Sequence, residues 1–158
     1  MKLVPPPIRR TKPSDLTAVL QLLHTAGLPT ADLTSAPGLQ LWVRESEGEL
    51  VGVIGLERSG AGALLRSLCV APGYQRRGLA HELVARLERD AQADGVEQLV
   101  LLTETAEAFF RSLGYEIVDR RYAPEQLQES AEFRSLCPAS AVCMTKSLAA
   151  PPAAVPHS

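Results

Sequence analysis

The stretch GYQRRGLA, from Gly73 to Ala80, decides how this chain is interpreted. It places Arg76 and Arg77 between two glycines, after an apolar run (63–71) that predicts a strand covered on both faces. The residues that follow, 78–94, predict an amphipathic helix, because leucines recur every fourth residue along one stripe. Such a turn suits a bound diphosphate, since the free N–H groups and the dipole at a helix N-terminus attract anions. A helix cap with two solvated arginines is an equally good alternative.

The composition is that of an ordinary globular protein. The 158 residues are 46% hydrophobic and 22% charged, which predicts one domain with a sizeable core. The net charge of -2 argues against the broad basic face of a nucleic-acid binder, so no nucleic-acid partner is expected. No apolar run reaches the roughly 18 residues of a membrane-spanning helix, and MKLVPPPIRR lacks the apolar core of a signal peptide. We therefore expect a cytoplasmic protein without a membrane partner.

The three cysteines, Cys69, Cys137 and Cys143, include no close CxxC pair. An odd number of thiols at these spacings is a poor disulfide framework and a poor zinc site. Buried thiols in a reducing compartment are the better interpretation, and we expect no bound metal.

The other segments alternate between strands and helices. Two strand-like runs, 39–46 and 50–58, flank a short polar turn and predict a hairpin. Further strands are predicted at 8–10, 97–103, 115–120 and 140–146, and further helices between 14 and 27, over 105–113 and over 124–136. This order predicts a mixed α/β domain over residues 1–148, followed by a disordered tail at 149–158.

The segment LCVAPGYQRRGLAHELV (68–84) resembles motif A of the Gcn5-related N-acetyltransferase (GNAT) superfamily, with the signature Q/R-x-x-G-x-G/A after an apolar strand. The downstream segment AFFRSLGYEIV (108–118) resembles motif B of the same superfamily. The resemblance spans residues 8–148. It implies a single α/β domain with a mixed, mostly antiparallel central sheet of about seven strands, helices on both faces and a splay between the fourth and fifth strands.

The resemblance also implies that acetyl-CoA is a co-substrate. By motif position, the backbone of Leu68, Cys69 and Val70 would pair with the pantetheine arm, and an N–H near Leu68 would polarise the thioester carbonyl. Phe110 of motif B would also line the cofactor site. The residues expected around the pyrophosphate are Gln75, Arg76, Arg77, Gly78, Leu79 and Ala80.

Motif B departs from the family pattern at Phe110. Many members carry a tyrosine there to protonate the leaving thiolate, and phenylalanine has no proton to donate. Either the thiolate leaves without a dedicated acid or another group serves. Tyr115 is interpreted as structural, because it follows Gly114 at the start of a predicted strand, and Phe109 is interpreted as core.

Glu57, near the end of the third predicted strand, is the best candidate for the base that takes the proton of the attacking amine. A solvated charge at a strand end is an equally good interpretation of this residue. Glu45 is the second choice, and Glu104 is placed beside the N-terminus of the next helix.

Arg66 interrupts the apolar run LLRSL, and a buried guanidinium needs an anionic partner. A protein carboxylate is slightly favoured as that partner, and a substrate carboxylate held by both arms of the guanidinium is the alternative. Ser67 and Thr103 are further candidates for hydrogen bonds to substrate, whereas Thr105 is interpreted as a helix N-cap.

Within the superfamily, GLPTADL, LLRSLCVAP and FRSLCPASAVCM are similar to arsenic-resistance N-acetyltransferases, and LLTETAEAFF resembles the catalytic domain of N-acetylglutamate synthases. These similarities imply acetyl transfer to a small amine, such as an arsenic-containing glutamate analogue. A non-catalytic CoA-binding sensor and a protein N-acetyltransferase are the alternatives. The oligomeric state stays open, with a homodimer as one option.

Overall fold

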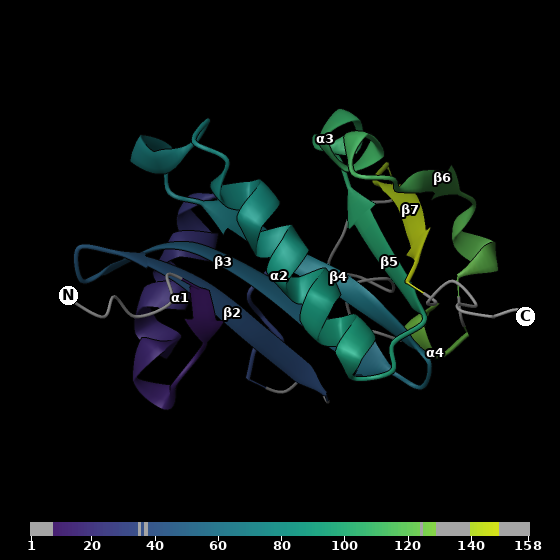
Figure 1. Ribbon diagram of the computed structural model, residues 1–158, viewed down its shortest axis with the longest axis horizontal. Helices are drawn as coiled ribbons and strands as arrows, with labels where there is room; N and C mark the ends of the chain where they lie inside the picture. Colours follow the sequence, from purple (N-terminus) through teal and green to yellow (C-terminus); the bar gives the residue numbers. More distant parts are fainter. Residues whose placement is uncertain (1–7, 35, 37, 124, 129–139, 149–158) are drawn as a thin grey trace, which may run out of the picture. The chain divides into compact units, whose positions relative to one another are not determined.

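The computed structural model describes residues 8–34, 36, 38–123, 125–128 and 140–148 of the chain (Figure 1). The strands are β1 (Ile8–Arg10), β2 (Leu39–Ser46), β3 (Glu49–Ser59), β4 (Gly62–Val70), β5 (Gln98–Thr103), β6 (Glu116–Val118) and β7 (Val142–Ser147). The helices are α1 (Leu16–Thr25), α2 (Leu79–Ala93), α3 (Glu107–Ser112) and α4 (Glu125–Gln128). Three single 3-10 turns complete the order: η1 (Pro13–Asp15), η2 (Pro72–Tyr74) and η3 (Arg120–Tyr122).

The strands form one seven-stranded sheet in the order β1-β2-β3-β4-β5-β7-β6. β4 and β5 are parallel. Antiparallel pairing joins β1 to β2, β2 to β3, β5 to β7 and β6 to β7. The register of the parallel pair covers Gly62–Leu64 and Gln98–Val100. The predicted mixed, mostly antiparallel sheet is confirmed, and its parallel pair lies where the splay was predicted.

The described residues fall into two compact units. The first comprises residues within 1–57 and 65–87, and the second comprises residues within 58–64 and 88–158. β4 and α2 each contribute residues to both units.

Helices cover both faces of the sheet in the first unit. Val19 and Leu23 of α1 form a core cluster with Val43, Val53 and Cys69 on one face. On the other face, a Cβ at Gly52 would lie 3.0 Å from the Leu83 side chain of α2. Because neighbouring residues of a strand point to opposite faces, Gly52 and Val53 place α2 and α1 on opposite sides, as predicted (Figure 1).

The second unit has its own core. Leu64, Val100 and Cys143 from three neighbouring strands pack with Ala123 and with Leu127 of α4. The thiols of Cys69 and Cys143 are free and buried, as predicted, and burial raises the pKa of Cys143 to about 11. Cys137, residues 129–136 of the predicted helix and the predicted tail (149–158) lie outside the described residues.

The predicted start of the third helix is wrong. α3 begins at Glu107 and has Ala106 at its N-cap position, so Thr105 is not the cap. Instead, Oγ1 of Thr103 accepts a hydrogen bond of 2.9 Å from the N–H of Ala106. The reason is that the hydroxyl at the end of β5 already serves the turn that leads into the helix, which is a common role for threonine.

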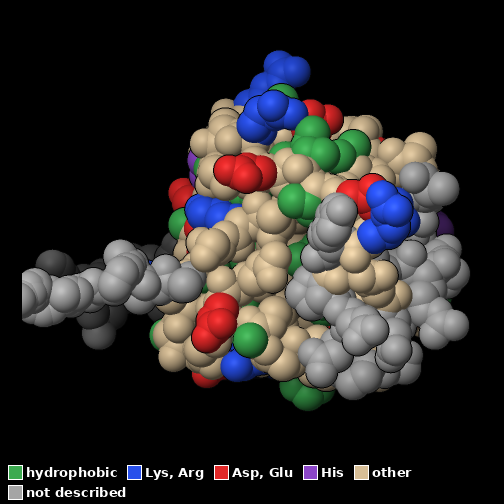
Figure 2. Space-filling model, turned by 90° about the vertical axis from the view of Figure 1, so that its right-hand side faces the viewer, with side chains coloured by type: hydrophobic (Ala, Val, Ile, Leu, Met, Phe, Trp, Pro, Cys, Tyr) green, Lys and Arg blue, Asp and Glu red, His purple; other side chains and the backbone are tan. Residues whose placement is uncertain are grey.

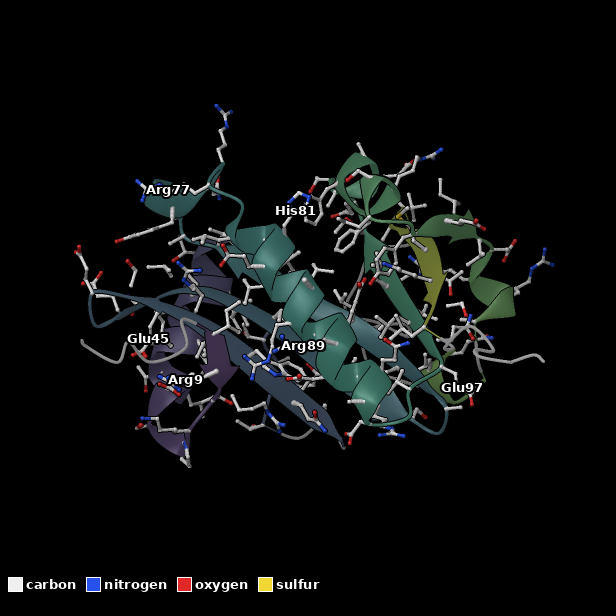
Figure 3. The ribbon with its side chains drawn as sticks, viewed as in Figure 1. Arg9, Glu45, Arg77, His81, Arg89 and Glu97 are labelled. Carbon is white, nitrogen blue, oxygen red and sulfur yellow. The ribbon has the colours of Figure 1, made fainter. Side chains whose placement is uncertain are left out.

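Arg9 ties η1 to the sheet. Its guanidinium donates to both carboxylate oxygens of Asp15, at 2.8 and 3.1 Å, and to Oε1 of Glu45 at 3.1 Å. Figure 3 shows Arg9 and Glu45 side by side. The hydrogen bonds from Arg9 hold the pKa of Asp15 down at about 2, below its ordinary value of 3.8.

We expect Asp15→Asn to lower the free energy of unfolding at neutral pH by about 1 kcal/mol, the net scale of one hydrogen bond. A carboxyl whose pKa is depressed by folding stabilises above its unfolded pKa and loses that contribution as pH falls through its folded pKa. The wild-type chain should therefore lose stability between about pH 4 and pH 2 more steeply than the variant. Urea unfolding at a series of pH values measures the difference, and parallel curves would contradict it.

Candidate functional site

A bulge divides β4 at Ser67. Ser67 has a φ of 62°, in the left-handed region that a regular strand residue avoids. Gly55 and Val53 lie on the same face of β3, and a Cβ at Gly55 would contact Arg66, so Arg66 lies on that face too. Cys69 packs against Val53 and therefore lies on the same face. Residues three apart cannot share a face in a regular strand, so the extra residue at Ser67 reverses the alternation. Leu68 and Val70 consequently point away from the side that carries Arg66.

The segment after β4 is held by its own hydrogen bonds. The N–H of Ala71 donates to the carbonyl oxygen of Val51 at 2.8 Å, and the N–H of Tyr74 donates to that of Ala71 at 2.8 Å. The side-chain amide of Gln75 donates to the carbonyl oxygen of Val70 at 3.0 Å. Gln75, predicted at the pyrophosphate, thus braces the loop with its side chain.

The loop ends in front of α2 with two residues in the left-handed region. Arg76 has a φ of 66° and Gly78 a φ of 81°, and α2 begins at Leu79. Such alternation turns successive N–H groups towards one side and forms an anion-binding concavity. A Cβ at Gly78 would have no other atom within 4 Å, so the space beside it is open. The predicted residues 75–80 therefore form one continuous loop and helix start with the features of an anion site.

The two arginines of this loop are exposed. The guanidinium carbon of Arg77 lies 5.1 Å from the centre of the Tyr74 ring, a cation–π contact. Figure 3 shows Arg77 on the loop and His81 in the first turns of α2. The guanidinium groups can thus add charge around a ligand that the backbone holds.

A buried ion cluster lies on the α1 face of the first unit. The guanidinium of Arg66 donates to both carboxylate oxygens of Asp32, at 2.6 and 2.7 Å, and to Oε1 of Glu57 at 3.2 Å. The Arg66 side chain has no exposed surface, and those of Asp32 and Glu57 are about a tenth exposed. Of the two partners that the sequence left open for Arg66, the structure supplies the protein carboxylate. The hydrogen bonds from Arg66 also lower the pKa of Asp32.

Gly55 makes room for this cluster. A Cβ there would lie 2.9 Å from the Leu41 side chain, 3.3 Å from the carbonyl oxygen of Arg66 and 3.5 Å from its side chain. Asp32 itself comes from the turn after α1, and sequence reasoning missed it. The sequence indicates only that a buried Arg66 needs an anionic partner. It does not identify Asp32, which lies 34 positions away, as that partner.

We expect Arg66→Met to lower the free energy of unfolding by about 3–5 kcal/mol, because it leaves two buried carboxylates without their cation. Urea unfolding at neutral pH measures the loss. If the variant kept its stability and had a raised KM for the acceptor, Arg66 would instead bind the substrate.

The other candidate residues of the first unit and Glu104 each have a hydrogen-bond partner in the protein. The hydroxyl of Ser67 accepts from Nε of Arg66 at 3.3 Å. Glu45 is 39% exposed and bound to Arg9, whereas Glu57 is buried. The two carboxylates lie towards opposite ends of the hairpin, since Glu57 is in register with Leu39 and Glu45 with Leu50. Glu104 accepts from the Ser140 hydroxyl at 3.1 Å.

Motif B forms an aromatic cluster in the second unit. Phe110 is buried and makes edge-to-face contacts with Phe109 and Tyr115, with ring centres 5.1 and 5.3 Å apart. The Tyr115 hydroxyl donates to Glu88 at 2.7 Å, and Lys146 donates to the same carboxylate at 3.1 Å. Burial raises the pKa of Tyr115. A buried, hydrogen-bonded phenol agrees with the structural role expected of Tyr115.

Within the described part of the chain, no group of three His, Cys, Asp or Glu side chains could hold a metal ion. No helix among those residues is long and apolar enough to cross a membrane. On the face shown in Figure 2, acidic and basic side chains are interspersed, in keeping with the net charge of -2.

Residues 37–117 match a family model described as an acetyltransferase (GNAT) domain. The chain is 34% identical over 97 residues to a "Probable N-acetyltransferase 14" of Danio rerio, a match that covers 57% of this chain and 34% of that protein. The chain thus spans about a third of the length of that curated relative.

Two solved structures are similar in fold. N-acetylglutamate synthase from Neisseria gonorrhoeae, complexed with coenzyme A and N-acetyl-glutamate, has a TM-score of 0.77 at 19% identity, over 89% of this chain and 34% of that chain. A Mycobacterium tuberculosis protein in complex with CoA and NLQ has a TM-score of 0.76 at 23% identity, over 90% of this chain and 99% of that chain. At these identities the likeness shows a shared fold.

Proposed function

Because the chain belongs to the GNAT acetyltransferase family, we propose that it transfers the acetyl group of acetyl-CoA to the amine of a small molecule. The binding of acetyl-CoA in this proposal rests on one observation: the loop in front of α2 contains two residues with positive φ, Arg76 and Gly78. This loop offers backbone N–H groups and a helix dipole to the pyrophosphate. The CoA complexes of two proteins with the same fold support this assignment.

In this proposal the thioester lies along β4 after the bulge. The backbone of Leu68, Cys69 and Val70 pairs with the pantetheine arm, and the N–H of Leu68 polarises the thioester carbonyl. The bulge at Ser67 supports this placement, because a bulge interrupts a strand ladder and re-aims the groups beside it.

The reaction is a direct transfer. The neutral amine nitrogen attacks the carbonyl carbon, a C–N bond forms, and the C–S bond breaks with its electron pair leaving on the CoA thiolate. The proton released by the nitrogen passes to the carboxylate of Glu57, directly or through one water. Phe110 has no proton to give the thiolate, so the thiolate leaves without help from this position.

The acceptor is proposed to be a small amine of the amino-acid type. Ser67 can contribute a hydrogen bond to it, since a hydroxyl that already accepts one bond can still donate. The same role for Thr103 stays a prediction. The similarity to N-acetylglutamate synthase supports an amino-acid acceptor. An arsenic-containing glutamate analogue, a cytoplasmic location, a role in arsenic resistance and a homodimer stay predictions.

Steady release of CoA thiol from acetyl-CoA tests the function. The amine panel includes glutamate, its arsenic- and phosphorus-containing analogues, and peptides with free N-termini or lysines. We expect turnover with at least one small amine and an N-acetylated product in the mass spectrum. Tight CoA binding without turnover on any amine would favour the sensor, and turnover on peptides alone would favour a protein acetyltransferase.

A further inference from the structure

The buried cluster around Arg66 carries more negative than positive charge. Two carboxylates, Asp32 and Glu57, share one guanidinium, and all three side chains are buried. Isolated charges are costly inside a protein, so a surplus carboxylate in such a place is uncommon without a use.

The two carboxylates hold the guanidinium unequally. Asp32 receives two short, parallel hydrogen bonds from Nη1 and Nη2 of Arg66, the arrangement that satisfies both charges best. Glu57 receives a single bond of 3.2 Å from Nη1. Asp32 is therefore the counter-ion of Arg66, and Glu57 is the surplus charge.

The cluster also lies next to the proposed thioester position. Arg66 directly precedes the bulge at Ser67, and Leu68 directly follows it. Glu57 points to the α1 face, as Val53 and Gly55 do, because these residues alternate along β3.

We infer that Asp32 is a positioning residue for acetyl transfer: by taking the short bonds from both arms of Arg66, it leaves Glu57 with one longer bond and keeps it available as a negative group that accepts the proton of the acceptor amine. The inference rests on the proposed function. It adds Asp32, which contacts neither reactant, to the residues on which the rate depends.

Removal of the Asp32 charge should turn Glu57 into the counter-ion. In Asp32→Asn, Arg66 can give its hydrogen bonds to Glu57, and a carboxylate bound to a cation is a poorer proton acceptor. In the double variant Asp32→Asn/Arg66→Gln, the competing cation is gone as well, and Glu57 is again the surplus charge.

The test is a comparison of kcat in the two variants and the wild type, with the amine that the function assay identifies. We expect kcat of Asp32→Asn to fall about tenfold, while the double variant recovers to within about threefold of the wild type. The KM for acetyl-CoA should stay within about twofold throughout, because Asp32 binds Arg66 on the α1 face, whereas the coenzyme is proposed to be held by backbone groups of residues 68–70 and 75–80. Thermal unfolding shows that each variant is folded.

Asp15→Asn is the matched control. Arg9 likewise holds one aspartate by two bonds and one glutamate by a single bond, in the same unit. This variant should lose stability without losing kcat.

Two results would overturn the inference while leaving the function intact: an active wild type with an unchanged kcat in Asp32→Asn, or a double variant no faster than Asp32→Asn. The second result would show that Asp32 matters for structure and not for charge. A wild type without turnover on any amine would instead overturn the proposed function, and the inference with it.

Discussion

Gly78→Glu is expected to weaken CoA binding by at least about 100-fold, because it places a carboxylate against the proposed pyrophosphate position, where like charges cost several kcal/mol. The space beside Gly78 is open, so the new side chain would enter the ligand's place and not the core. The positive φ of 81° adds backbone strain of about 1 kcal/mol to any residue with a Cβ. Titration calorimetry with CoA measures the affinity.

Gly78→Ala separates charge from strain, since it brings the same backbone cost without the carboxylate. We expect it to bind CoA only several-fold more weakly than the wild type. A folded Gly78→Glu variant with unchanged CoA affinity would show that the loop does not hold the donor.

Glu57→Gln is expected to lower kcat by about 100-fold at neutral pH, the scale of a lost general base. The deficit should shrink as pH rises, because more of the acceptor amine is already neutral and hydroxide can take its proton. Glutamine has nearly the same shape, and Arg66 keeps its two bonds to Asp32, so the fold should be preserved. Thiol release measured between pH 6 and 10 gives the profile.

The same substitution at Glu45 discriminates between the two predicted bases. Glu45 is more exposed and lies towards the other end of the hairpin. If Glu45→Gln showed the large deficit and Glu57→Gln the wild-type profile, the base would be Glu45.

Local patterns were sufficient to predict most elements of the fold. The β2–β3 hairpin followed from two apolar runs around a polar turn, and α2 followed from its leucine stripe. Both signals come from side chains close in sequence, which periodicity can detect. The start of α3 was missed because two threonines precede it and either hydroxyl could serve a turn. Thr103 accepts from the N–H of Ala106, three residues on, whereas a cap at Thr105 would serve N–H groups further along the chain.

The loop proposed to hold the coenzyme (73–80) was likewise visible in sequence, since its glycines and the helix start lie within one short stretch. The partner of Arg66 was not. The need of Arg66 for an anion could be predicted, but Asp32 meets it from a turn 34 positions away. The bulge at Ser67 left no signal either, because serine adopts a left-handed φ only where the surrounding sheet imposes it.

The extra residue in β4 has a consequence for how such a protein can diversify. Arg66, before the bulge, binds the carboxylates on the α1 face, whereas Leu68 and Val70, after it, point to the other face. In the proposed function, where the backbone of residues 68–70 holds the coenzyme, we therefore expect substitutions on the α1 face to affect the acceptor side more than coenzyme binding. One added backbone position would thus let the two proposed specificities on a single strand change independently of each other.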